Sequence, residues 1–383
     1  MKARNAVSAG VLLLLLTSSL PLAHAIGING GNGLTYVKSA WNLKPGYLTL
    51  YGRTRFFGKV STQNQPTAVT YWDVQGALSF NYGITDHVEL AIAPVMYQDT
   101  HRGQTGYNIP DDLFLGLKLG SYNLKGTSLT WAVSFDTRFP TAKYHNVPFE
   151  PYSAGTIEWG FTTMLTYARD PLYPDDNLNI HANFGYVNHN DVGKKLLPRY
   201  NISVTNMSQQ FIYGFGMKIP SSEFDFSIEL YGNKFLQRPP LTAYSLEDYI
   251  YLSPGISYHA YRWMTLSFST DLRLSEDVNQ SLVAPPAPDL PNYPGWRINL
   301  GLSLTLLPTS VYRLSDKDIL IRKAESRREL FEQIIKEQRE TESAEEELER
   351  IKEERRKAER ELERLRRILE GDLKKKKEDS NNK

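Results

Sequence analysis

Fourteen charged or imidazole side chains occupy positions that alternate with large apolar residues along this chain. They are Arg53, Arg55, Asp73, Glu89, Lys118, Asp136, Arg138, Glu158, His181, Lys218, Glu229, Asp271, Arg273 and Arg297. Both signs of charge occur in this set. The groups can pair with one another in a filled polar interior, or they can line a water-filled path in which opposed charges orient solutes. The residue types alone leave both possibilities open.

The histidines and cysteines predict neither a catalytic site nor a metal site. His87, His101, His145, His181, His189 and His259 are scattered among expected turns, loops and strands, and no serine beside them forms a recognisable motif. The chain has no cysteine, which excludes disulfides, thiolate nucleophiles and cysteine-based metal sites. Histidines in loops are more often simply exposed than metal ligands. We therefore expect a protein that is not an enzyme and that has no cofactor.

The elements that would position the fourteen side chains are β-strands. Trp296–Leu306 shows the pattern most clearly, because every second residue is large and apolar. Its length exceeds the usual 5–6 residues of a soluble strand and matches the roughly 9–11 residues that a tilted strand needs to cross a bilayer. Twelve segments are predicted as strands: 47–57, 69–82, 88–97, 112–119, 129–139, 157–167, 178–186, 211–219, 224–231, 250–258, 264–274 and 296–306.

The connections between these segments alternate in length. The short ones are 84–87, 123–126, 170–177, 220–223 and 260–262, and the long ones are 58–68, 98–111, 140–156, 188–210, 237–248 and 275–294. Short turns on one side and long loops on the other are typical of an outer-membrane barrel. The predicted fold is a closed all-β transmembrane barrel of about twelve antiparallel strands, with the fourteen side chains inside. A soluble β-protein is the alternative, but it has no reason to keep this alternation.

Composition agrees with a membrane barrel. The chain has 23 Tyr, 16 Phe and 6 Trp, and such rings suit the two interfaces of a bilayer. A formal net charge of +1 argues against a nucleic-acid partner. After residue 25 the chain has no apolar run of about 18 residues, so no membrane-spanning helix is expected. The expected partner is the lipid bilayer, which strands would cross.

Composition also predicts the domain boundaries. Residues 1–25 read as a signal peptide, with Lys2 and Arg4, an apolar core and Ala23-His24-Ala25 as the cleavage site. Residues 26–45 are rich in Gly and Asn, and are either a periplasmic lead-in or a segment in the barrel mouth. The barrel is expected over 46–313, a charged helix over 314–371 and a disordered tail over 372–383.

The charged helix contains a heptad-like seam. Its members are Ala344, Leu348, Ile351, Ala358, Leu362, Leu365 and Leu369, with Arg355 as a charged interruption. One interpretation is a solitary helix of roughly 50 residues and about 75 Å. The other is a coiled coil through which residues 314–371 self-associate or bind a periplasmic partner.

Two resemblances extend this reading. The pattern Asn299-x-Gly301-x-x-Leu304-x-Leu306 resembles the last-strand signal that bacterial barrel-assembly machinery reads, although its final residue is Leu and the chain continues. The ordered segments 82–90, 111–118, 139–141, 229–232 and 252–258 resemble the outer-membrane transporter family named for meta-pathway phenol degradation. The second resemblance implies a bacterial outer-membrane barrel that passes hydrophobic or aromatic compounds. It supplies no binding residues.

The expected function is a channel for small solutes in the bacterial outer membrane, with the helical tail in the periplasm. The alternative is a structural or anchoring barrel whose tail binds a partner or oligomerises.

Overall fold

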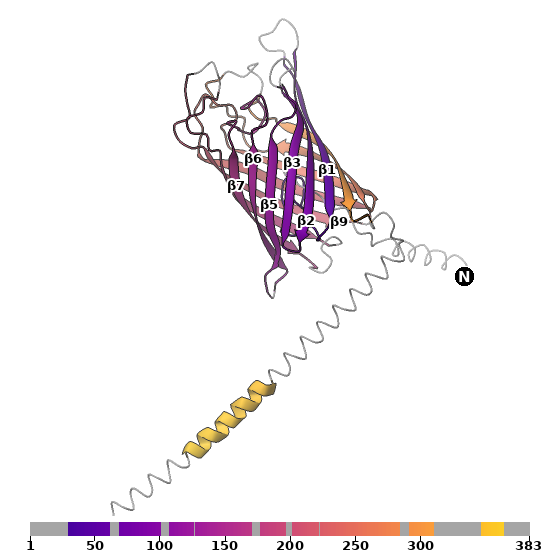
Figure 1. Cartoon of the computed structure of the whole chain (residues 1–383), viewed down its shortest axis with the longest axis vertical. Helices are drawn as coiled ribbons and strands as arrows, with labels where there is room; N and C mark the ends of the chain where they lie inside the picture. Colours follow the sequence, from indigo (N-terminus) through magenta and orange to yellow (C-terminus); the bar gives the residue numbers. More distant parts are fainter. Residues whose placement is uncertain are drawn as a thin grey trace, which may run out of the picture. The chain divides into compact units, whose positions relative to one another are not determined.

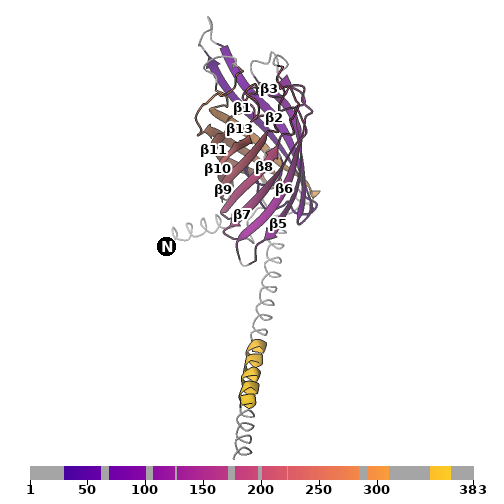
Figure 2. The ribbon, with the colours of Figure 1, turned by 90° about the vertical axis from the view of Figure 1, so that its left-hand side faces the viewer.

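The computed structural model describes residues 30–61, 69–100, 107–125, 127–170, 177–196, 201–221, 223–283, 291–309 and 346–363. The chain separates into two compact units, residues 1–314 and 315–383. The first unit contains a closed β-barrel, which Figures 1 and 2 show from two sides as a ring of tilted strands. Within its described residues, the second unit is a helix over 346–363.

The barrel consists of antiparallel strands in which each long strand pairs with two neighbours. The strands are β1 Leu48–Ser61, β2 Val69–Thr85, β3 Val88–Thr100, β4 Tyr107–Asn108, β5 Leu113–Asn123, β6 Leu129–Phe139, β7 Glu158–Ala168, β8 Asn179–Asn188, β9 Gln209–Pro220, β10 Phe224–Gln237, β11 Tyr249–Tyr261, β12 Met264–Arg273 and β13 Trp296–Leu307. The long strands pair in chain order, with β3 beside β5, and the β1–β13 pairing closes the ring. The predicted twelve-stranded closed barrel is confirmed, and the two-residue β4 beside β3 is an addition.

Side chains alternate between the two faces of the barrel wall along most of each long strand. On β13, Trp296, Leu300 and Leu302 are exposed, whereas Arg297 and Asn299 are buried inside. Large apolar residues are exposed in the same way on the other long strands. An exposed apolar belt around a polar interior is the pattern of a barrel that contacts lipid. Among the residues that the structure describes, no helix is long and apolar enough to cross a bilayer.

Aromatic rings gather near both ends of the strands. Near the short turns, Tyr122 packs against Trp131 with ring centroids 6.0 Å apart. Near the long loops, Phe56 packs against Trp296 with centroids 6.1 Å apart. All four rings are exposed on the outer surface. Rings with an apolar body and a polar edge are enriched at the two interfaces of a bilayer, so the two groups mark the height of the belt.

The strands on the long-loop side extend further than the apolar pattern predicted. β1 continues through Gly58–Ser61, and these residues keep pairing with β2 up to Val69. β3 continues to Thr100, and Gln98 and Asp99 pair with β4. Beyond the apolar belt the ladder needs hydrogen bonds but no longer needs apolar side chains. The period-two signal therefore ends before the strand does.

The helix over 346–363 confirms helical structure in the charged tail. Leu348, Ile351 and Leu362 of the predicted seam are 53%, 65% and 68% exposed, and Ala358 is exposed as well. Ala344, Leu365 and Leu369 lie outside the described residues, as does the remainder of 314–371. The coiled coil therefore stays a prediction.

A charge placed on the outer face tests the lipid belt. Leu300 is 56% exposed near the middle of β13, so Leu300→Arg should lower the free energy of unfolding in phospholipid vesicles by about 2–4 kcal/mol. Denaturant titration of the vesicle-inserted protein measures this difference. Val278→Arg, at an exposed residue outside the strands, is the control and should change stability by less than about 0.5 kcal/mol. Equal effects of the two substitutions would contradict the assignment of the belt.

Candidate functional site

A hairpin formed by residues 31–43 lies inside the barrel. Its two arms are joined by hydrogen bonds from the amide of Leu34 to the carbonyl of Val37 (2.8 Å) and from Ser39 to Asn32 (2.8 Å). At Gly33 a Cβ would lie 2.6 Å from the Cα of Lys38, so only glycine lets the arms approach this closely. Of the two places left open for 26–45, these contacts favour the barrel interior for residues 31–43.

Two buried carboxylates of the barrel wall hold the hairpin backbone. Glu229 on β10 accepts hydrogen bonds from the amides of Thr35 (3.0 Å), Tyr36 (2.7 Å) and Val37 (2.8 Å). Glu89 on β3 accepts from the amides of Asn32 (2.9 Å) and Leu43 (2.8 Å), one at each end of the hairpin. Hydrogen bonds to a charged acceptor are stronger than neutral ones, and here they also satisfy backbone groups that water cannot reach.

Apolar contacts against a glycine-rich part of β9 add to this hold. Leu34 and Val37 are buried, and their side chains lie over Gly216 and Gly214. A Cβ at Gly216 would lie 2.6 Å from Cδ1 of Leu34, and one at Gly214 would lie 2.9 Å from Cγ2 of Val37. The missing side chains of these two inward positions thus make room for the hairpin.

The tip of the hairpin carries two polar side chains. The ring of Tyr36 stacks on Tyr231 with centroids 3.8 Å apart, and its hydroxyl donates to Asp271. The ammonium of Lys38 lies 2.7 Å from Oδ1 of Asp136. The tip therefore contacts β10 and β12, which both pair with β11, and also β6, which is four strands away from β10.

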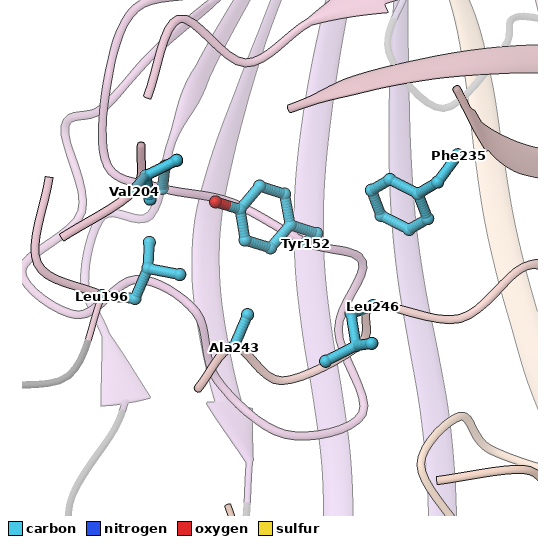
Figure 3. Close-up of a cluster of buried hydrophobic side chains, with 7 residues drawn as sticks. Tyr152, Leu196, Val204, Phe235, Ala243 and Leu246 are labelled. Carbon is cyan, nitrogen blue, oxygen red and sulfur yellow. The ribbon is translucent and has the colours of Figure 1, made fainter. Parts of the chain in front are cut away.

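The long loops fold together at the other end of the barrel. One apolar cluster joins residues from three loops and the end of β10: Tyr152, Ala154, Leu196, Val204, Phe235, Ala243 and Leu246. Figure 3 shows the ring of Tyr152 at the centre of this cluster. Its hydroxyl donates to Asp191 at 2.7 Å. In the first of these loops, Phe149 packs against Phe57, and Glu150 forms an ion pair with Arg55 inside the barrel.

A cavity of about 350 Å³ lies between the hairpin tip and these loops. Tyr36 and Lys38 line it from the hairpin, and Tyr144, His145 and Tyr152 line it from the loop that follows β6. The wall contributes polar side chains and aromatic rings, among them Arg55, Phe114, Asp136, Arg138, Glu158, Tyr231, Tyr249 and Arg297. Its volume is within the range of sites for small molecules.

The fourteen side chains singled out from the sequence all lie at buried or partly buried positions, and most have a polar partner inside the barrel. Ion pairs join Lys118 to Glu89, Lys218 to Asp225, Arg297 to Asp271, Arg55 to Asp73 and Glu150, and Arg138 to Asp112 and Glu158. Arg53 donates to Gln75, Arg273 pairs with Asp277, and His181 contacts Thr166. Five of the fourteen line the cavity: Arg55, Asp136, Arg138, Glu158 and Arg297. Whether these five contact a passing solute stays a prediction.

The histidines are engaged in local contacts. His259 lies between Oγ1 of Thr265 (3.0 Å) and Asp225 (3.0 Å), but none of these three residues lines the cavity. His189 lies 3.2 Å from Glu158, and His101 lies outside the described residues. Within the described ranges, no group of three or more acidic or imidazole side chains is arranged to hold a metal.

The loop residues around the cavity have shifted pKa values. Burial, followed by the neighbouring Asp112, raises the pKa of Asp111 to about 7. Burial lowers the pKa of His145, so this imidazole is neutral at pH 7. Burial alone would raise the pKa of Glu150, but the adjacent Arg55 guanidinium brings this pKa below its ordinary value. The cavity therefore has a fixed ion pair on one side and a titratable carboxyl on the other.

Sequence reasoning missed several residues of this site. Asp225 shares the inward face of β10 with Glu229, and the two-residue period could have identified it. Glu150 and Asp111 lie in loops, where no period marks the inward direction. The hairpin has a sequence signal in Gly30-Gly31-Asn32-Gly33 followed by Leu34, but that signal gives no position for the segment.

The whole chain was compared with known protein families, curated proteins and solved structures. A scan against protein-family models finds no match, and a search of curated proteins finds none. Among solved structures, the chain is similar to the NanC porin (12% identity, 68% of this chain, 100% of that chain, TM-score 0.43). It is also similar to an outer membrane channel from Pseudomonas putida F1 (11%, 70%, 98%, 0.44) and to the Ralstonia pickettii toluene transporter TbuX (7%, 69%, 90%, 0.33). Because these TM-scores are below 0.5, we infer neither family nor solute from them.

The hold of Glu229 on the hairpin can be measured directly. Glu229→Gln removes the charge and one of the two acceptor oxygens, at a cost of about 1.5–3 kcal/mol. Amide hydrogen exchange of Thr35, Tyr36 and Val37 should become roughly 10 to 100 times faster. Mass spectrometry of peptides from this segment reads the rate. Glu223→Gln, at an exposed acid, is the matched control, and unchanged exchange in Glu229→Gln would contradict the assigned role.

Proposed function

We propose that this chain is a channel of the bacterial outer membrane that passes small solutes through a lumen closed by its own hairpin. The observation that carries the proposal is an internal cavity inside a closed barrel whose outer face is apolar. A barrel that served as an anchor alone would need no internal space of this size. The proposed route to the membrane is insertion by the barrel-assembly machinery, which the last-strand pattern of β13 supports.

Passage requires that both closures move. On the short-turn side, the hairpin fills the lumen and is held by hydrogen bonds from five backbone amides to Glu89 and Glu229. On the other side, the loop that carries Glu150 and Tyr152 covers the cavity. The cavity lies between the two closures, so we propose that they open in turn. This arrangement supports stepwise passage of one solute at a time.

The lining of the cavity supports solutes with an aromatic or apolar body. Tyr36, Phe114, Tyr144, Tyr231 and Tyr249 are among the residues that line it, from the hairpin, the wall and a loop, and the rings of Tyr36 and Tyr231 stack on each other. Aromatic faces favour flat or compact apolar groups, and the surrounding hydroxyl and charged groups orient the polar end. A volume of about 350 Å³ is suited to a small molecule and excludes a folded chain.

Deletion of residues 30–43 tests the proposal. Because the hairpin occupies the lumen, its removal should raise single-channel conductance in planar bilayers several-fold. Gly216→Val should have the same effect in the full chain, since the new side chain would occupy the space of Leu34. Gly295→Val, where a Cβ has no neighbour within 4 Å, is the matched control. A barrel that inserts but conducts no ions, with or without the hairpin, would contradict the proposal.

One observation favours the second candidate, an anchoring barrel. Leu348, Ile351 and Leu362 lie along the described helix at seam spacing and are exposed, which suits a helical partner. Deleting residues 315–383 should then abolish association in detergent while leaving barrel insertion intact. Sedimentation of the full chain and of the truncated chain measures this. If the full-length and truncated chains form assemblies with the same number of subunits, the anchoring candidate is contradicted.

A further inference from the structure

We propose that the cavity binds a small organic cation, a primary or quaternary ammonium with a compact apolar body. Its charge lies beside Asp111 and its body lies against the tyrosine rings. This inference rests on the proposed channel function and names the class of solute.

The cavity lining has four acidic side chains and four cationic ones, and each of the cationic ones is already paired. Its bases are Lys38, Arg55, Arg138 and Arg297. The carboxyl groups that line it or pair with these bases are Asp73, Asp111, Asp112, Asp136, Glu150, Glu158 and Asp271. Every base already has at least one carboxylate within 4 Å, so no cation of the wall is left to hold an anionic solute.

Asp111 is the acid of this wall that lacks a basic partner. Among the described residues it forms no ion pair, and its Oδ1 accepts one hydrogen bond, from the side-chain Nδ2 of Asn108 at 3.1 Å. The residue is 8% exposed and lines the cavity. Its backbone is fixed, because its amide donates to the carbonyl of Val95 and its carbonyl accepts from Thr141. The guanidinium that acts on it, that of Arg138, already pairs with Asp112 and Glu158. A buried carboxylate without an ion-paired partner of its own is costly, and a cation in the cavity would supply that partner.

The aromatic rings near the cavity already receive cations from the chain itself. The guanidinium of Arg297 lies 4.5 Å from the ring centroid of Tyr251, and that of Arg138 lies 5.4 Å from the centroid of Phe114. The ammonium of Lys143 lies 5.1 Å from the centroid of Tyr144, a ring that lines the cavity. The electron-rich faces of Tyr and Phe attract ammonium groups, and cages of such rings are the usual site for quaternary ammonium.

The tyrosines and Asp111 act on different parts of the same solute. Tyr36, Tyr231 and Tyr249 line the cavity beside the hairpin, whereas Asp111 and Tyr144 line it from the segments around β4 and after β6. An ammonium with methyl substituents has both a charge for the carboxylate and a surface for the rings. A neutral solute of the same shape would leave Asp111 without its counter-charge, so it should bind more weakly.

The titration of Asp111 gives this binding a pH dependence. Burial raises the pKa of Asp111 to about 7, and a cation binds its ionised form. The titratable and charged groups around Asp111 are Asp112 beside it, Arg138 of β6, and His145 and Glu150 of the following loop. Affinity for a cation should therefore rise between about pH 6 and about pH 8.

The test is calorimetric titration of the purified full chain in detergent with three probes of one shape. Choline carries a positive charge, dimethylbutanol is its neutral carbon analogue, and dimethylbutanoate carries a negative charge. We expect choline to bind at least about tenfold more tightly than either analogue. Asp111→Asn should remove this preference and its pH dependence, while Glu276→Gln, at an exposed loop acid, should preserve both.

Equal affinity for choline and dimethylbutanol in the unsubstituted protein would overturn the proposal, and so would a choline preference that Asp111→Asn leaves intact. If Asp111→Asn fails to fold, the three-probe comparison on the unsubstituted protein still decides. Conductance in planar bilayers separates this proposal from the channel function. A conducting barrel without cation preference rejects the solute class alone, whereas a barrel that does not conduct rejects the channel.

Discussion

The physical constraint on which the structure depends is that a wall in contact with hydrocarbon must pair all of its backbone hydrogen-bonding groups within the protein. Twelve long strands meet this constraint by closing on themselves, since β1 pairs with β13 as well as with β2. Closure fixes the direction of every side chain. Residues such as Leu300 point to the outside, and their neighbours such as Arg297 and Asn299 point to the inside.

The same closure also places charged groups in the interior of the barrel. Charged groups that the alternation turns inward must find partners away from bulk water, and much of that partnership comes from outside the strands. Glu150 of a loop pairs with Arg55, Lys38 of the hairpin pairs with Asp136, and the hairpin amides satisfy Glu229. The contacts that occlude the lumen are thus the same contacts that pair its charged groups. Opening the proposed channel would replace these contacts with water or with solute.

Much of the barrel could be predicted from the sequence because its signal is local. The period of two identified every long strand, and the alternation of short and long connections indicated closure. Strand ends such as Gly58–Ser61 were missed because the ladder continues where the apolar side chains stop. The position of the hairpin was left open because Thr35, Tyr36 and Val37 bond to Glu229, which lies more than 190 residues away in the sequence. Asp111 and the loop cluster around Tyr152 were missed for the same reason, since their contacts are set by tertiary structure.

The most direct test of the account is depth-resolved quenching of tryptophan fluorescence by brominated lipids in vesicles. In single-tryptophan variants, Trp131 and Trp296 lie on the outer face near opposite ends of the strands, whereas Trp41 belongs to the hairpin and lies inside. The account predicts strong quenching of Trp131 and Trp296 by bromine near the lipid headgroups, and little quenching of Trp41. Equal and weak quenching of all three residues would show that the apolar belt does not face lipid, which would contradict the account.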